Sequence, residues 1–203
     1  MRSLKRILLA AASCALLFPL PASPGAQVYE PLAASVRSTM ASAVRKQDAP
    51  VLQFQRTEDA YRWLFEMSRR LARRIPDRAA RVQFLRTVHY EATRAGLDPQ
   101  LVLSVIEVES AFRKYAVSRS GARGYMQVMP FWRRQIGRSS DNLFHMRTNL
   151  RYGCVILRHY LDIEKGDPER ALGRYNGDLE SRRYARRVVG AWKQRWKYEG
   201  PTH

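Results

Sequence analysis

The 203-residue chain is poor in cysteine and in acidic residues, and each shortage limits what the protein can be. Its two cysteines, Cys14 and Cys154, cannot supply a disulfide framework, and without a histidine cluster they do not indicate a zinc site. Asp and Glu number 18 against 36 Lys and Arg, which gives a formal net charge of +18. Such a charge attracts polyanions and anionic surfaces, but it does not choose among them.

The chain also lacks internal repeats, long low-complexity tracts and any extended run that alternates with the period of a β-strand. Hydrophobic residues nevertheless make up 45% of the chain, which is enough to bury a core. From Thr57 nearly to the end, apolar residues recur at helical spacing. The sequence therefore predicts an all-α protein.

The N-terminus has the layout of a secretory signal peptide. A basic stretch over residues 1–6 precedes an apolar run over 7–20, and a segment rich in proline and small residues follows. We expect residues 1–26 to be a signal peptide that is removed on export. Two other interpretations stay open: an N-terminal core helix, and a lipoprotein signal in which Cys14 is lipidated.

Two further regions follow the signal peptide. Residues 27–76 are interpreted as an N-terminal linker and an accessory helix, because residues 27–56 carry little pattern and include Pro31 and Pro50. A helix is predicted from Thr57, and Pro76 ends it. Its apolar stripe is expected to contain Tyr61, Leu64, Phe65, Ser68, Leu71 and Ala72. A helical domain is predicted over residues 77–198.

Asp-Pro pairs mark the starts of two helices in that domain, because an aspartate caps a helix and proline suits its first position. One helix begins at Pro99 and is expected to reach about Phe112, and the other begins at Pro168 and stops near Gly177. The other elements are expected to be an irregular loop over 113–130, a short helix near 131–136, a long helix over about 148–165 and a last helix over 181–197.

Glu109 is the leading candidate for acid–base chemistry. It follows Val105, Ile106 and Val108 near the end of its helix, where apolar neighbours and the helix dipole both disfavour a charged carboxylate. A carboxyl whose pKa is raised in this way can deliver a proton near neutral pH. Glu107 competes for the role, but it lies about 200° further round the helix, so the two do not form an acid–base pair.

Several short elements occur in a fixed order around Glu109. They are Glu109-Ser110 at a helix end, Gly124-Tyr125-Met126-Gln127, the stretch from Ala171 to Tyr175-Asn176-Gly177, and Glu180-Ser181-Arg182-Arg183-Tyr184. Together they resemble the SLT-type lytic transglycosylases, whose domain is similar to goose-type lysozyme. The resemblance covers Asp77 to Trp196. It implies a lysozyme-like helical domain with a deep substrate groove.

The resemblance also implies an activity. Glu109 would protonate the β-1,4 glycosidic oxygen between N-acetylmuramic acid and N-acetylglucosamine. The ionised carboxylate would then take the proton of the sugar's own 6-hydroxyl, leaving a 1,6-anhydromuramic end. We expect peptidoglycan glycan strands as the partner, no cofactor, no metal, no nucleic acid, a monomer, and a location in the bacterial periplasm, either free or lipid-anchored through Cys14.

Six further residues receive roles from the resemblance. Ser118 would lie near the N-acetyl group, Gln127 would contact substrate, and Met126 would line the groove or the core. Tyr175 would place its hydroxyl against Glu109 or the sugar, Asn176 would hold the backbone at a helix end, and Glu180 would orient substrate. A turn-forming Ser118, a core Tyr175 and a surface ion pair of Glu180 with Arg182 or Arg183 stay open.

This chain departs from the family pattern in two places. Tyr125 stands where leucine is common, and the connection from Tyr175 to Tyr184 is short, which leaves one wall of the groove and Glu180 in doubt. Three other functions are alternatives: a non-catalytic peptidoglycan-binding or scaffold module, a hydrolytic lysozyme, and a nucleic-acid-binding protein. The signal peptide and the lack of a nucleic-acid motif argue against the last.

Overall fold

The computed structural model describes residues 27–45, 52 and 54–200. Among these residues the regular elements are helices, and the extended pairings are isolated bridges from Arg123 to Val117 and to Val128. The all-α class is thus confirmed. The elements are α1 (Ala34–Arg45), α2 (Thr57–Leu71), α3 (Arg78–Arg94), α4 (Pro99–Ser110), α5 (Trp132–Ile136), α6 (Met146–Ile163), α7 (Pro168–Asn176), α8 (Arg182–Gly190) and a π-helical turn, η1 (Ala191–Arg195).

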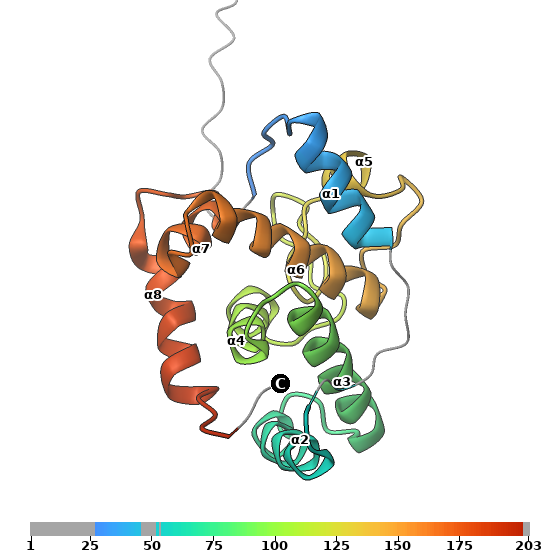
Figure 1. Ribbon diagram of the computed structural model, residues 1–203, viewed down its shortest axis with the longest axis vertical. Coiled ribbons are helices and arrows are strands. Elements are labelled where there is room, and N and C mark those ends of the chain that lie inside the picture. Colours follow the sequence, from blue (N-terminus) through green and yellow to red (C-terminus); the bar gives the residue numbers. More distant parts are fainter. Residues whose placement is uncertain (1–26, 46–51, 53, 201–203) are drawn as a thin grey trace, which may run out of the picture.

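Helix α4 lies in the middle of the molecule, between α3 and α8 (Figure 1). Its residues from Pro99 to Ile106 are all buried. The side chain of Asp98 caps the helix by accepting the Gln100 N–H at 2.6 Å, as its sequence predicts. The helix ends at Ser110 rather than at the expected Phe112, because Ala111 and Phe112 adopt left-handed backbone conformations.

The described part of residues 27–56 packs against the rest of the fold, so the interpretation of that stretch as a linker is wrong for this part. Helix α1 packs against α5 and α6, and its Met40 and Val44 are buried in the core. The predicted signal peptide, with Cys14, lies outside the described residues. In the part of the chain that is described, no helix is both long and apolar enough to cross a membrane.

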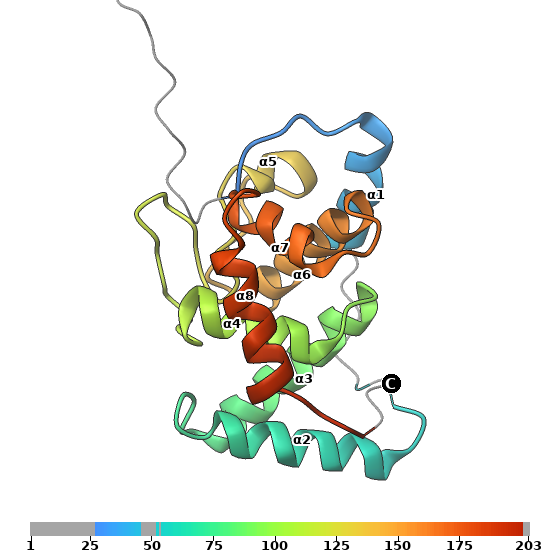
Figure 2. The same ribbon diagram turned by 90° about the vertical axis from the view of Figure 1, so that its left-hand side faces the viewer.

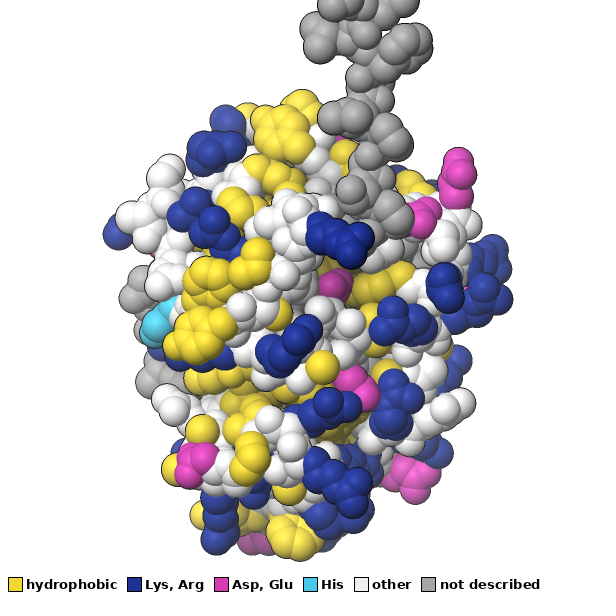
Figure 3. Space-filling model, turned by 180° about the vertical axis from the view of Figure 1, so that it is seen from behind, with side chains coloured by type: hydrophobic (Ala, Val, Ile, Leu, Met, Phe, Trp, Pro, Cys, Tyr) yellow, Lys and Arg dark blue, Asp and Glu magenta, His cyan; other side chains and the backbone are white. Residues whose placement is uncertain are grey.

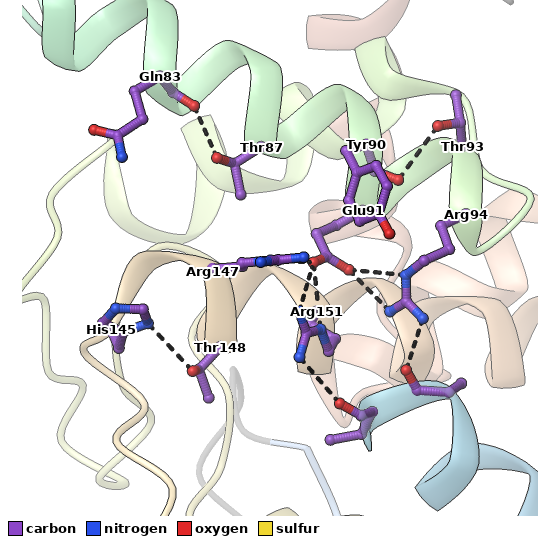
Figure 4. Close-up of polar contacts among 12 residues, drawn as sticks. Gln83, Thr87, Tyr90, Glu91, Thr93, Arg94, His145, Arg147, Thr148 and Arg151 are labelled. Carbon is purple, nitrogen blue, oxygen red and sulfur yellow. Dashed lines mark hydrogen bonds and ion pairs between the residues drawn. The ribbon is translucent and has the colours of Figure 1, made fainter. Parts of the chain in front are cut away.

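A buried ionic cluster joins α1 to α3 and α6 (Figure 4). Glu91 has no exposed surface, and its carboxylate accepts hydrogen bonds from Arg94, Arg147 and Arg151. Arg94 and Arg151 also donate to carbonyl oxygens in the last turn of α1, at 2.7 and 3.2 Å. The cluster therefore fixes the N-terminal helix to the rest of the fold.

Helix α2 forms an outer layer against α3 (Figure 2). Its buried face matches the predicted stripe only in part. Trp63, Met67 and Leu71 are completely buried, whereas Tyr61 and Phe65 keep 66% and 72% of their surface exposed. The predicted stripe is therefore wrong for Tyr61 and Phe65. Trp63 enters the core because its indole N–H can reach the Gln100 side chain, at 3.3 Å.

The predicted last helix is α-helical over α8 and π-helical over η1. After α8 the chain widens into η1, where the Trp196 N–H donates to the Ala191 carbonyl, five residues back, at 2.9 Å. The indole of Trp196 donates to Glu107 at 2.7 Å, and that of Trp192 donates to Asp98 at 3.0 Å. Both tryptophans thus fasten the end of the chain to α4.

Candidate active site

Glu109 lies in the last turn of α4 and faces the start of α8. The hydroxyl of Tyr184 donates a hydrogen bond to its Oε1 at 2.6 Å. Tyr184 is itself buried, and it reaches this position because Ser181 caps α8 one turn earlier. The carboxylate of Glu109 therefore has one short, neutral hydrogen-bond donor, supplied by an element 75 residues further along the chain.

Burial raises the pKa of Glu109 from its ordinary value of 4.5 to about 7. Two smaller influences oppose this rise: the hydrogen bond from Tyr184 and the positive charge of Arg187. The residue keeps some exposed surface, so solvent reaches it although the carboxylate is closely surrounded. At neutral pH Glu109 is poised between its acid and base forms, which suits a group that both gives and takes a proton.

Glu107 is occupied elsewhere, as the helical geometry predicts. Its carboxylate accepts hydrogen bonds from Arg195 Nε at 3.0 and 3.1 Å and from the Trp196 indole at 2.7 Å. Glu107 therefore serves as an ion-paired anchor for the end of the chain, and Glu109 stands alone as the acid–base candidate on α4.

The chain leaves Glu109 through a tightly bent loop. Ala111 and Phe112 have φ angles of 50° and 64°, and Gln127 has a φ of 47°, all in the left-handed region. Such conformations cost free energy in residues other than glycine, and they cluster where surrounding contacts fix a functional loop. At Gly124 a Cβ atom would come within 2.5 Å of Asn149 Nδ2 and 2.7 Å of the Leu143 carbonyl, so only glycine fits.

The segment from Gly124 to Gln127 is held by hydrogen bonds from distant elements. Asn149 on α6 accepts the Met126 N–H at 2.8 Å, and the Tyr175 hydroxyl on α7 donates to the Met126 carbonyl at 2.7 Å. The Gln127 side chain donates to the carbonyls of Gly124 and Ala116, at 2.8 and 3.2 Å. These hydrogen bonds therefore tie the loop to helices α6 and α7.

The family profile described as "Transglycosylase SLT domain" matches residues 86–196, more than half of the chain. The chain belongs to this family. The match contains Glu109, the Gly124–Gln127 segment, Tyr175 and Tyr184. Helices α1 and α2 lie before the matched region.

Individual relatives match parts of this SLT chain. A membrane-bound lytic murein transglycosylase C from Actinobacillus pleuropneumoniae serotype 5b (strain L20) is 52% identical over 48 residues, which are 24% of this chain and 13% of that protein. A transglycosylase of Enterobacteria phage PRD1 is 33% identical over 96 residues, which are 47% of this chain and 35% of the phage protein. The chain thus spans only a minor part of the curated relatives that it matches.

Among solved structures, lytic transglycosylase Slt from Pseudomonas aeruginosa is similar to this chain with a TM-score of 0.49 and 21% sequence identity. The similarity covers 68% of this chain and 28% of that one.

The side chains of Met126 and Tyr175 lie in the core of the SLT domain. Met126 is completely buried beside Gly153, where an added Cβ would come within 2.4 Å of the Met126 sulfur. Tyr175 is 1% exposed, and its hydroxyl bonds to the loop backbone rather than to Glu109. The structure thus favours the core position for both side chains. From the core they support the conformation of the loop.

The structure describes the remaining predicted site residues through their local contacts and exposure. The Ser118 hydroxyl accepts the Ala122 N–H at 3.0 Å, which is a turn-forming contact. Gln127 is largely buried, and Asn176 is the last residue of α7, before a left-handed Gly177. Glu180 is exposed in the loop before α8, and no ion pair with Arg182 or Arg183 occurs among the described residues.

Four further residues contribute contacts or charge to the site and its loop: Tyr184, Arg187, Asn149 and Gln27. The sequence signal for Tyr184 is its place in the Glu180–Tyr184 family element. The roles of Asn149 and Gln27 come from contacts with segments far along the chain, for which the local sequence carries no sign.

Over residues 27–45, 52 and 54–200, no group of three or more His, Cys, Asp or Glu residues could hold a metal ion. Cys154 is buried, and burial raises the pKa of its thiol well above the ordinary value. That thiol is therefore an unreactive core group.

Proposed function

We propose that this protein is a peptidoglycan lytic transglycosylase. It would cleave the β-1,4 bond between N-acetylmuramic acid and N-acetylglucosamine and leave 1,6-anhydro-N-acetylmuramic ends. The observation that carries this proposal is Glu109, a single carboxyl with a pKa of about 7 and a short hydrogen bond from Tyr184, inside an SLT domain.

The proposed reaction uses Glu109 twice. Its proton passes to the glycosidic oxygen as the bond from the anomeric carbon to that oxygen breaks, which releases the N-acetylglucosamine side as an alcohol. The 6-hydroxyl oxygen of the muramic residue then bonds to the anomeric carbon, and its proton returns to Glu109. Attack from within the same sugar needs orientation rather than a second protein carboxylate.

Tyr184 would act mainly on the intermediate stage of this cycle. Its hydroxyl donates to Oε1, and a hydrogen bond to a carboxylate is stronger than one to the neutral acid. It therefore stabilises the anion that exists after the first proton transfer. Arg187 adds a weaker, more exposed influence of the same sign.

The other assignments are part of the same proposal. Ser118, Gln127, Asn176 and Glu180 would contact the glycan or shape its groove, and Met126 and Tyr175 would support the loop. Residues 77–198 would form the catalytic domain and residues 1–26 a signal peptide, which would place a monomeric enzyme in the periplasm, either free or lipid-anchored. On one face of the molecule Lys and Arg side chains far outnumber Asp and Glu, which suits an anionic wall polymer (Figure 3).

The direct test is digestion of purified peptidoglycan sacculi, with the released muropeptides identified by mass. The parent should release products that are lighter by one water than reducing muropeptides, and Glu109→Gln should release none. Glu107→Gln is the matched control, because it makes the same chemical change two residues away at an ion-paired anchor. It should keep activity within a few-fold of the parent.

Other outcomes would support the alternative functions. Reducing ends from the parent would identify a hydrolytic lysozyme on the same fold. If a folded parent releases nothing but still binds sacculi, the protein is a non-catalytic wall-binding or scaffold module.

A further inference from the structure

Gln27 is a buried residue that lies far outside the matched SLT region. Only 4% of its surface is exposed. A buried side-chain amide must find hydrogen-bond partners, and Gln27 finds its partners about 100 residues along the chain.

Three hydrogen bonds join the Gln27 amide to the segment from Gln127 to Trp132. Its Nε2 donates to the Gln127 carbonyl at 3.3 Å. Its Oε1 accepts from the Met129 N–H and from the Trp132 indole, each at 3.1 Å. One side chain thus ties together the end of the Gly124–Gln127 loop and the start of α5.

The position of this contact matters because Gln127 has a left-handed backbone. The preceding residue, Met126, is held by Asn149 and Tyr175, both within the SLT match. Among the described contacts, the Gln127 carbonyl is held from outside the match, by Gln27. Loss of this amide would leave buried polar groups on the loop unpaired, and it would release one anchor of a strained residue.

The N-terminal segment is itself firmly held. Gln135 on α5 donates to the Glu30 carbonyl at 3.0 Å, and the Glu91 cluster binds the last turn of α1. Gln27 is therefore presented to the loop by a segment with its own attachments, which a positioning residue requires.

We propose that Gln27 is a positioning residue that sets the conformation of the Gly124–Gln127 loop for glycan binding, so that a segment preceding the SLT match completes the site. This inference rests on the proposed function for the glycan-binding role of the loop. The physical part of it, fixation of the loop, does not depend on activity.

The test compares Gln27→Ala and Gln27→Glu with the parent in the full chain. Gln135→Ala is the matched control, because it breaks a bond between the same N-terminal segment and α5 without touching the loop. Four quantities are measured: kcat and KM on soluble glycan strands, the pH profile of activity, and amide hydrogen exchange over residues 123–129.

Gln27→Ala should raise KM about ten-fold and speed exchange in the loop, with kcat within about two-fold. The pH profile should not move, because Gln27 does not contact Glu109. Gln27→Glu should not recover the loss, because a carboxylate oxygen in the place of Nε2 cannot donate to the Gln127 carbonyl, although Oε1 still accepts from Met129 and Trp132. Gln135→Ala should change neither KM nor loop exchange.

Two outcomes would overturn the inference. Unchanged loop exchange in Gln27→Ala would show that the amide does not fix the loop, whether or not the parent is active. An equal rise in KM for Gln135→Ala would assign the effect to general loosening of the N-terminal segment. If the parent proves inactive, the proposed function fails separately, and loop exchange still decides the role of Gln27.

Discussion

Glu91 and Glu109 both have little contact with solvent, yet their surroundings differ in kind. Glu91 has no exposed surface and lies among Arg94, Arg147 and Arg151. Glu109 keeps some exposed surface and receives a short hydrogen bond from neutral Tyr184. The negative charge of Glu91 is balanced by arginines in direct contact. The ionised form of Glu109 has a neutral hydrogen-bond donor in place of such a cation.

The difference shows how one residue type serves structure in one place and chemistry in another. A buried carboxylate among guanidinium groups holds elements together, and removal of its charge leaves those cations uncompensated. A buried carboxyl without a cation in direct contact has a raised pKa, so it exchanges a proton near neutral pH at a cost in stability. A substitution at either carboxylate can therefore change one site while leaving the other intact.

The largest effect on stability is expected from Glu91→Gln. It leaves the buried Arg151 and its neighbours without their counter-charge, so the free energy of unfolding should fall by about 3–5 kcal/mol. For a chain of this size that corresponds to a fall of roughly 10 °C in melting temperature. Thermal unfolding followed by circular dichroism measures it.

Glu66→Gln is the matched control for this prediction. Glu66 also pairs with two arginines, Arg69 and Arg70, but on the surface of α2. Surface pairs contribute about 1 kcal/mol or less. Equal melting temperatures for the two variants would show that burial of the Glu91 cluster adds nothing to stability.

The parts of this fold that were predictable from sequence are those with local causes. The starts of α4 and α7 follow from Asp98-Pro99 and Asp167-Pro168, because cap and proline act within one turn. The end of α4 was not predictable in the same way, since Ala111 carries no signal for a left-handed backbone. On α2, aromatic residues lie on two faces, and periodicity alone could not show that Trp63 rather than Tyr61 faces the core.

The candidate site likewise has features with local causes and features that depend on distant parts of the chain. Glu109 could be singled out because its apolar neighbours and its motif are adjacent in sequence. Its hydrogen bond to Tyr184 spans 75 residues, and the contact of Gln27 with the Gln127 carbonyl spans 100. Such pairings depend on how helices pack, which one chain's local pattern does not encode.

Glu109 should lower the free energy of unfolding at neutral and alkaline pH. Between its ordinary pKa of 4.5 and its folded pKa of about 7, the unfolded chain ionises this group while the folded protein does not. Its contribution to stability is therefore complete below pH 4.5 and is lost as the pH rises to about 7. Relative to the parent, Glu109→Gln should be equally stable at pH 4 and up to about 3 kcal/mol more stable at pH 8.

Urea unfolding of both proteins at pH 4, 6 and 8 measures this difference, and the comparison cancels groups common to both. Glu107→Gln should show no such gain at pH 8, because its carboxylate is paired with Arg195. A constant difference between Glu109→Gln and the parent across the pH range would mean that Glu109 titrates alike in the folded and unfolded chains.

The smallest effect is expected from Tyr184→Phe. This change removes the hydrogen bond from Tyr184 to Glu109, so that the ionised carboxylate is stabilised even less than that of Glu91. Loss of the hydroxyl removes a hydrogen bond that favours the ionised carboxylate, so the pKa of Glu109 should rise further. Since the first step needs the protonated acid, the fall in activity at high pH should move to higher pH. The anion formed in that step loses its donor, so kcat should drop about ten-fold, with little change in melting temperature.

A pH–rate profile of muropeptide release by the parent, Tyr184→Phe and Arg187→Ala tests this. Arg187→Ala should shift the profile in the same direction by a smaller amount, because Arg187 is exposed and its charge is screened by solvent and salt. Added salt should therefore reduce the effect of Arg187→Ala while leaving that of Tyr184→Phe in place. A shift to lower pH in Tyr184→Phe would contradict the proposal, since it would mean that the hydroxyl supports the neutral acid rather than the anion.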